Sequence, residues 1–171
     1  MNKLFTVLSV LVVFTTASCR KVVGDGPVQT ETRAVPDFDA IDVGMGADVT
    51  YTPASVARLE LRAQANILGV IETYVQSGRL KIKFRDRVNV RNHERIHINV
   101  SGLGLRALGL SGSGRTNVSG TMQGPSLRME ISGSGDLYVA GVQADYLSAS
   151  VSGSGSIRVG SGAVNRAEVH V

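Results

Sequence analysis

Residues 93–97 read His-Glu-Arg-Ile-His and match the H-E-x-x-H pattern of zinc proteases. That pattern needs a helix, because a helix brings the two histidines one turn apart onto one face, within reach of one zinc ion. Here Ile96, Ile98 and Val100 alternate with polar residues as in a strand, where residues four apart are separated by ~13 Å. Two histidines that far apart can barely share a metal held at ~2 Å from each nitrogen. We therefore expect a chance match on a solvated strand and no metal site.

The serines of a repeated Ser-Gly-Ser-Gly sequence could act as nucleophiles. A serine nucleophile needs a base, usually a histidine, that a third group holds in place. Outside residues 93–97 the only histidine of the chain is His170, which cannot serve three equivalent serine sites. We interpret these serines as turn residues and expect no catalytic residues.

Asp37, Asp39, Asp42 and Asp48 form the densest group of carboxylates and could indicate a glycosidase pair or a calcium site. Three of them, all except Asp42, could converge only through the turn at residues 44–46. We expect solvated strand and turn positions instead, and no cofactor.

A basic strand is the best candidate for a binding site. Its leucine, isoleucine and phenylalanine residues occupy one face, and its cations occupy alternate positions on the other: Arg79, Lys81, Lys83, Arg85 and Arg87. A straight strand would space them over ~26 Å. On an exported protein the partner would be an acidic polysaccharide, a lipopolysaccharide phosphate or a lipid headgroup. The alternative is a solubilising edge strand, whose cations discourage edge-to-edge aggregation.

Cys19, the only cysteine, follows a segment typical of a secretory signal. The chain begins with a short positively charged stretch, continues with a largely apolar run at residues 4–14, and has small residues at 15–18. The apolar run is too short to span a bilayer of ~30 Å as a helix. We predict a lipoprotein signal peptide at residues 1–18 and lipid attachment at Cys19, which would place the protein in the cell envelope with the membrane as a partner. An ordinary secretory signal with a cysteine near the cut remains the alternative.

Composition argues against several other functions. The formal net charge is +4, but export argues against a nucleic-acid partner, and we expect none. The four tyrosines and four phenylalanines supply little aromatic surface for stacking, and one cysteine excludes a disulfide framework.

The positioning elements are predicted to be strands, so the fold class is all-β. Residues 19–29 have turn formers and no periodicity and are predicted to be a tether. Residues 30–100 form an N-terminal β region with a hairpin turn at residues 76–78 and one short helical turn, capped by Asn66, at residues 66–71. Its strand patterns lie at residues 38–43, 49–51, 59–63, 79–85 and 96–100.

Residues 101–171 repeat. Ser-Gly-Ser-Gly occurs at residues 111–114, 132–135 and 152–155, and each copy lies between two short apolar alternating strands. A unit of ~20 residues cannot bury both faces alone, whereas stacked units form one shared core. The pattern predicts a β-solenoid continuous with the N-terminal region as one domain, with glycine at the tight corners because glycine adopts a positive φ without steric cost.

Several segments together carry a resemblance: residues 32–33, 38–43, 47–49, 65–67 and 71–82, followed by the Ser-Gly-Ser-Gly repeats. From about residue 30 to 171, the chain resembles the family known as putative auto-transporter adhesin, head GIN domain. The resemblance implies a right-handed β-helix-like solenoid on an exported or lipid-anchored bacterial protein, with cell adhesion as its proposed role. It carries over no catalytic or binding residues.

We therefore expect a non-catalytic envelope lipoprotein that serves as a surface adhesin or structural solenoid, with acidic polysaccharide or cell-surface glycans as partners. The alternative is a carbohydrate-binding or carbohydrate-active protein on a pectin-lyase-like superhelix, which paired carboxylates in a cleft would favour. The apolar residues Ala167, Val169 and Val171 form the last strand, and no polar cap covers them. We expect either a shortened chain or a homo-oligomer formed through this end of the solenoid.

Overall fold

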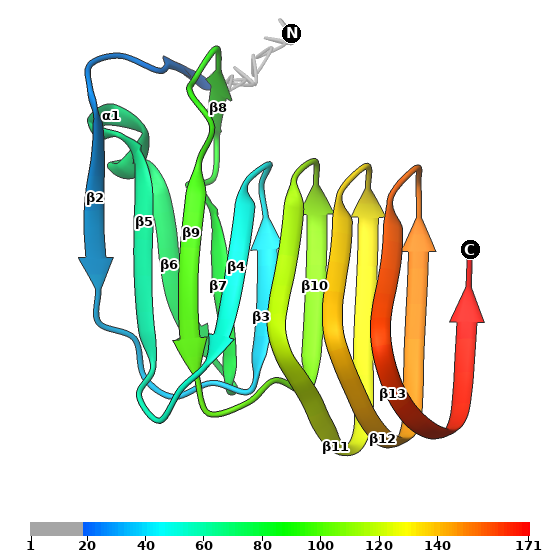
Figure 1. Ribbon diagram of the computed structural model, residues 1–171. Coiled ribbons are helices and arrows are strands. Elements are labelled where there is room, and N and C mark those ends of the chain that lie inside the picture. Colours follow the sequence, from blue (N-terminus) through cyan, green and yellow to red (C-terminus); the bar gives the residue numbers. More distant parts are fainter. Residues whose placement is uncertain (1–18) are drawn as a thin grey trace, which may run out of the picture.

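The computed structural model describes residues 19–171, and the predicted signal peptide at residues 1–18 lies outside this range. Strands dominate the described chain, which confirms the all-β prediction (Figure 1). One large sheet curls back on itself so that its inner face encloses the core. A separate two-stranded sheet lies beside it. The elements in chain order are β1 (Arg20–Val23), β2 (Val28–Arg33), β3 (Ala40–Gly44), β4 (Asp48–Pro53), β5 (Arg58–Gln64), α1 (Ala65–Leu68), β6 (Ile71–Gln76), β7 (Arg79–Phe84), β8 (Val88–Arg91), β9 (His97–Gly102), β10 (Ala107–Gly112), β11 (Arg115–Gly133), β12 (Asp136–Ser152) and β13 (Ser156–His170).

Copies of the Ser-Gly-Ser-Gly sequence lie directly beside one another. Ser111 pairs in register with Ser132 across the parallel strands β10 and β11, and Ser132 pairs with Ser152 across β11 and β12. The corner at residues 44–47 belongs to the same stack, because β3 pairs with β10 and β4 pairs with β11. The sequence period of 20 to 21 residues therefore equals the offset between paired residues of these neighbouring strands.

Apolar side chains at equivalent positions form continuous rows in this core. One row crosses six strands and consists of Leu80, Ile41, Leu108, Met129, Ala149 and Val169. Met129 is fully buried, Ala149 is 9% exposed and Val169 is 65% exposed. The row is thus covered at its N-terminal end and uncovered at β13.

The N-terminal end is covered by α1 and by Arg33. Ile67 and Leu68 of α1 are buried against the core. The Arg33 guanidinium donates to the carbonyls of Leu68 and Ile71 at 3.0 and 2.8 Å, so polar groups at this end of the core have partners. This closed end contrasts with the open edge of β13.

Residues 19–29 are not a tether without structure, and that prediction is wrong. β1 pairs in parallel with β8, and β2 pairs antiparallel with β5. Asn66 does not cap α1, whose first turn has no side-chain cap. Its side-chain amide instead donates to the Val23 carbonyl at 2.7 Å and accepts from the Asp25 amide, which fixes the segment after β1 to the domain. The predicted hairpin at residues 76–78 is confirmed between β6 and β7.

Candidate binding surface

The predicted basic strand is β7, and the sheet places it differently from the expectation. β7 lies between β3 and β6, so the interpretation as an edge strand is wrong. The strand ends at Phe84, and Arg87 lies in a turn with φ = 62°. Arg79, Lys81 and Lys83 therefore lie on the sheet, while Arg85 and Arg87 lie beyond it.

Acidic neighbours neutralise much of this strand. Arg79 forms an ion pair with Asp42 at 2.7 Å, and Lys83 forms one with Asp86 at 2.7 Å. The hydrogen bond between Lys83 and Asp86 raises the pKa of the lysine and lowers the pKa of the aspartate. Glu72 lies 3.5 Å from Arg85. On β7, only Lys81 has no acidic partner among residues 19–171, so the stripe is mostly a set of exposed ion pairs.

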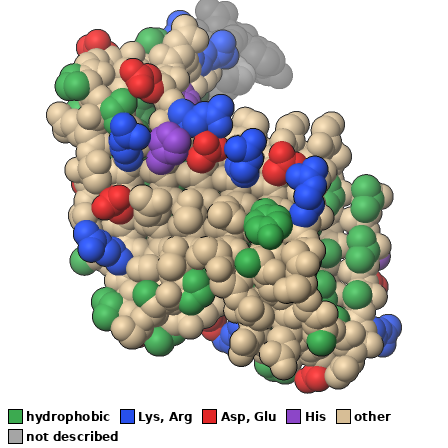
Figure 2. All heavy atoms as spheres, viewed as in Figure 1, with side chains coloured by type: hydrophobic (Ala, Val, Ile, Leu, Met, Phe, Trp, Pro, Cys, Tyr) green, Lys and Arg blue, Asp and Glu red, His purple; other side chains and the backbone are tan. Residues whose placement is uncertain are grey.

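A polar groove runs along the corners of the stack, between them and β8. This corner groove has a volume of about 540 Å³ and includes Asp48, His93, Arg95, Arg115, Ser134 and Asp136 among its lining residues. Figure 2 shows a band of cationic, anionic and histidine side chains across this end of the visible face. In register, His97 lies beside Asp48, and Arg115 lies beside Asp136.

Asp48 is the electrostatic centre of the corner groove. Arg95 donates to its carboxylate at 2.9 Å, and the Arg115 amide donates at 3.2 Å. Partial burial by itself would raise the pKa of Asp48, but these two hydrogen bonds, assisted by the charge of Arg95, hold the pKa below its usual value. The carboxylate is therefore ionised and already paired, which suits a structural ion pair better than a general acid.

The other predicted chemical groups do not converge either. His93 directs Nδ1 toward the Glu94 carbonyl, whereas His97 begins β9, as the strand interpretation requires. Asp39, Asp42 and Asp48 each pair with a different arginine. Over residues 19–171 no group of three histidine, cysteine or acidic side chains is arranged to hold a metal ion.

A second groove of about 390 Å³, the outer groove, crosses the strands β11, β12 and β13. It contains two carboxylates, Glu130 and Glu168, together with Tyr146 and His170. Arg128 pairs with Glu130, while Glu168 accepts a hydrogen bond from the Tyr146 hydroxyl and lies 3.4 Å from His170. The Tyr146 hydrogen bond lowers the pKa of Glu168, which opposes a general-acid role.

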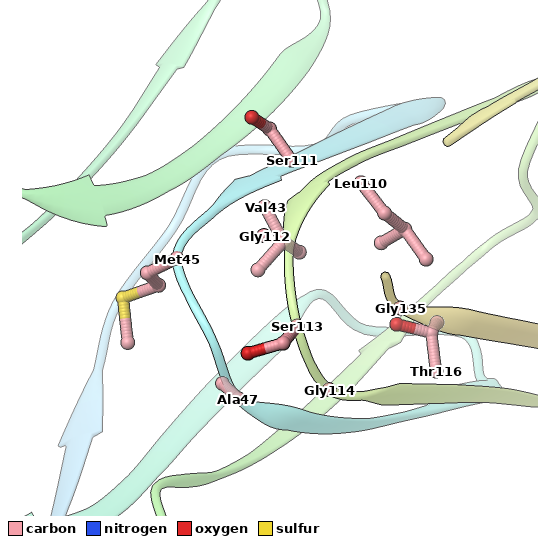
Figure 3. Close-up of a pocket in the computed structure, with 10 residues that line it drawn as sticks. All are labelled: Val43, Met45, Ala47, Leu110, Ser111, Gly112, Ser113, Gly114, Thr116 and Gly135. Atoms are coloured by element: carbon pink, nitrogen blue, oxygen red, sulfur yellow. The ribbon is translucent and has the colours of Figure 1, made fainter. Parts of the chain in front are cut away.

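The corners themselves leave no room for a ligand. Figure 3 shows the corner of residues 110–114, with Val43 of β3 and Thr116 of β11 beside its glycines. The cavity there measures about 10 Å³, room for one water molecule at most. A Cβ on Gly133, whose φ is 134°, would lie 2.6 Å from the Gly112 carbonyl oxygen. Glycine at Gly133 thus serves both the backbone angle and the close stacking.

Cys19, the predicted lipid attachment residue, is exposed at the start of the described chain. In the part of the chain that the structure describes, no helix is long and apolar enough to cross a bilayer. The corner groove was not predicted. Its signal in the sequence is the residue directly after each Ser-Gly-Ser-Gly copy, since Arg115, Asp136 and Ser156 are all polar and stack in register.

Solved crystal structures share this fold at low sequence identity. A "putative lipid binding protein" from Parabacteroides distasonis matches with a TM-score of 0.79 and 20% identity, over 88% of this chain and 65% of that one. A "putative adhesin" from the same species matches with a TM-score of 0.67 and 21% identity, over 87% and 71% of the two chains. Another from Parabacteroides merdae gives 0.69 and 20%, over 86% and 70%.

The chain thus spans less than two thirds of the length of the first of these proteins, and identities this low establish the shared fold alone. No curated protein matches the chain. The family model described as "Putative auto-transporter adhesin, head GIN domain" matches residues 37–171, from just before β3 to beyond the end of β13. The chain therefore belongs to that family.

Proposed function

We propose that this protein is a non-catalytic lipoprotein of the cell envelope, anchored through Cys19, that acts as a surface adhesin. Its strands from β3 onward would form a right-handed β-helix-like solenoid of Ser-Gly-Ser-Gly units. Membership of the adhesin head family supports this role, as do relatives that are named adhesins.

The observation that carries the proposal is the set of polar rows on the outside of the stack. Asn117, Tyr138 and Arg158 pair in register across three strands, and so do Ser126, Tyr146 and Arg166. Parallel strands hold such rows at ~4.8 Å spacing on a rigid surface. Long, shallow rows of hydrogen-bonding groups suit an extended polymer or another cell surface better than a small substrate, which favours an enclosed pocket.

Metabolic labelling tests the anchor. Cells that produce the chain and are fed labelled palmitate should incorporate the label into the protein. Cys19→Ala should abolish the label and release the protein into the soluble fraction. An unlabelled Cys19→Ala protein that stays with the membrane would contradict the proposed attachment.

Carbohydrate binding is the second candidate, and the outer groove favours it, because Glu130 and Glu168 share one polar concavity with Tyr146. The carboxylates are paired rather than poised as an acid, so we propose binding there and not hydrolysis. On a glycan array, the wild-type protein should bind acidic or neutral glycans, and Tyr146→Ala should lose this binding. A loss in Lys81→Glu instead would assign binding to the cations at residues 79–87.

A further inference from the structure

β1 and β8 form a small parallel sheet apart from the curled sheet. We call β1, β8 and residues 85–87, which lead from β7 into β8, the ribbon. Its five cations are all exposed: Arg20, Lys21, Arg85, Arg87 and Arg91. Among the described residues only Arg85 of these five has an acidic partner, Glu72, and the single acid of the ribbon, Asp86, pairs with Lys83 on β7. The ribbon is therefore a concentrated patch of unneutralised positive charge.

The ribbon is firmly attached to the domain and directly adjoins Cys19. The amide of Arg20, the residue after Cys19, donates to the Arg87 carbonyl at 2.8 Å. Val22 of β1 and Val90 of β8 pack against the core, and the Asn66 side chain holds the end of β1. No flexible spacer separates Cys19 from the folded domain, so a group attached at Cys19 would lie beside the cations.

The ribbon lies at the corner end of the stack. Lys83, near the end of β7, pairs with Gly44 at the first corner, and the chain continues from there into the ribbon. Val90 and His93 face the corners across the corner groove. Figure 1 shows the ribbon and the corners at the same end of the strands.

We propose that the ribbon is a membrane-docking surface that binds the phosphate groups of anionic lipid headgroups. This inference rests on the proposed function in one respect, since the lipid at Cys19 would hold the ribbon against the bilayer. Guanidinium and ammonium groups are the natural partners of phosphates, and Lys and Arg near an anionic membrane surface each add to its affinity. Docking here directs the corners toward the bilayer and the opposite bends, at residues 119–126 and 140–145, away from it.

Vesicle binding tests the surface independently of lipidation. The full chain carrying Cys19→Ala is mixed with two kinds of vesicle. One is phosphatidylcholine alone, and the other contains about 30% phosphatidylglycerol, which gives it an anionic surface. The ribbon variant adds Lys21→Glu and Arg91→Glu. The matched control adds Arg58→Glu and Arg62→Glu, which change the net charge equally at two exposed positions on β5. Thermal melting verifies that both variants remain folded.

We expect the chain to prefer anionic vesicles, the ribbon variant to lose roughly tenfold or more of that affinity, and the control to lose less than about twofold. The preference should weaken as salt rises, because exposed charges are screened. Equal losses in both variants, or no preference for anionic vesicles, would overturn the proposal. Ribbon-dependent binding to soluble alginate without binding to anionic vesicles would also overturn it and assign the surface to polysaccharide. Palmitate labelling at Cys19 is a separate readout, so failure of docking and failure of anchoring are distinguishable.

Discussion

Tyr51 shows how single residues secure the stack from within. Its side chain is 1% exposed, and its hydroxyl donates to the Gly102 carbonyl at 2.9 Å. Burial raises the pKa of Tyr51 to about 12, so the hydroxyl remains a donor at any physiological pH. The Ala54 amide also donates to the same carbonyl, at 2.7 Å, which limits the cost of losing the tyrosine hydroxyl.

We predict that Tyr51→Phe lowers the free energy of unfolding by about 1 kcal/mol, the usual net contribution of one such hydrogen bond. Urea denaturation followed by circular dichroism measures this change. Tyr74→Phe is the control, since Tyr74 is 39% exposed and should leave stability unchanged. Equal losses in the two variants would show that the Tyr51 hydroxyl has no special role.

The lowered pKa of Asp48 makes a second prediction at the residue scale. A carboxyl whose pKa is lower in the folded protein stabilises that state above its unfolded pKa, and the contribution disappears as pH falls through the folded pKa. The difference in melting temperature between wild type and Asp48→Asn should therefore be full above about pH 5 and shrink toward pH 3. The exposed Asp37→Asn is the control. A difference that stays constant across this range would contradict the ion pair with Arg95.

At the scale of elements, the corners should be the least tolerant positions of the fold. A Cβ on Gly133 would meet the Gly112 carbonyl oxygen at 2.6 Å, whereas a Cβ on Gly104 would meet nothing within 4 Å. Gly133→Ala should lower the free energy of unfolding by about 2–4 kcal/mol, because it combines backbone strain with overpacking. Gly104→Ala should cost less than about 1 kcal/mol. Chemical denaturation of both variants checks the ranking, and similar stabilities would contradict the close stacking of corners.

The elements that could be predicted from sequence are those with a local pattern. Alternating side chains predicted β7 and β9, and the repeated Ser-Gly-Ser-Gly predicted corners that stack in register, because each signal lies within one turn of the chain. The pairing of β1 with β8 could not be predicted, since the partners lie 68 residues apart, as Arg20 and Val88 do, and β1 has no apolar period of its own.

The same limit applied to the candidate sites. The cations of β7 were visible in the sequence. Their partners Asp42 and Glu72 come from other strands, so the net charge of the strand could not be predicted. The corner groove was missed for the same reason. Its residues are consecutive in the stack rather than in the chain, and only the polar residue after each repeat hinted at it.

For the whole molecule, the uncovered edge of β13 predicts association. Val159 and Val169 are 39% and 65% exposed on this strand, which among residues 19–171 pairs only with β12. Because α1 covers the other end, we propose that two copies associate edge to edge through β13, which buries the apolar rows of both. Light scattering should report a dimer that Val169→Lys converts to monomer, whereas Val56→Lys, at another exposed valine, should not. A wild-type monomer at high concentration would contradict the proposal.

The attachment of whole cells tests the central claim, that this chain is a membrane-anchored binding surface. Cells that produce equal amounts of wild type or Cys19→Ala are applied to surfaces coated with the glycans that bind wild type on the array, and the bound cells are counted after washing. The account predicts strong attachment with wild type, loss of attachment with Cys19→Ala, and competition by added purified Cys19→Ala protein. Equal attachment of both cell types, with no effect of the added protein, would contradict it.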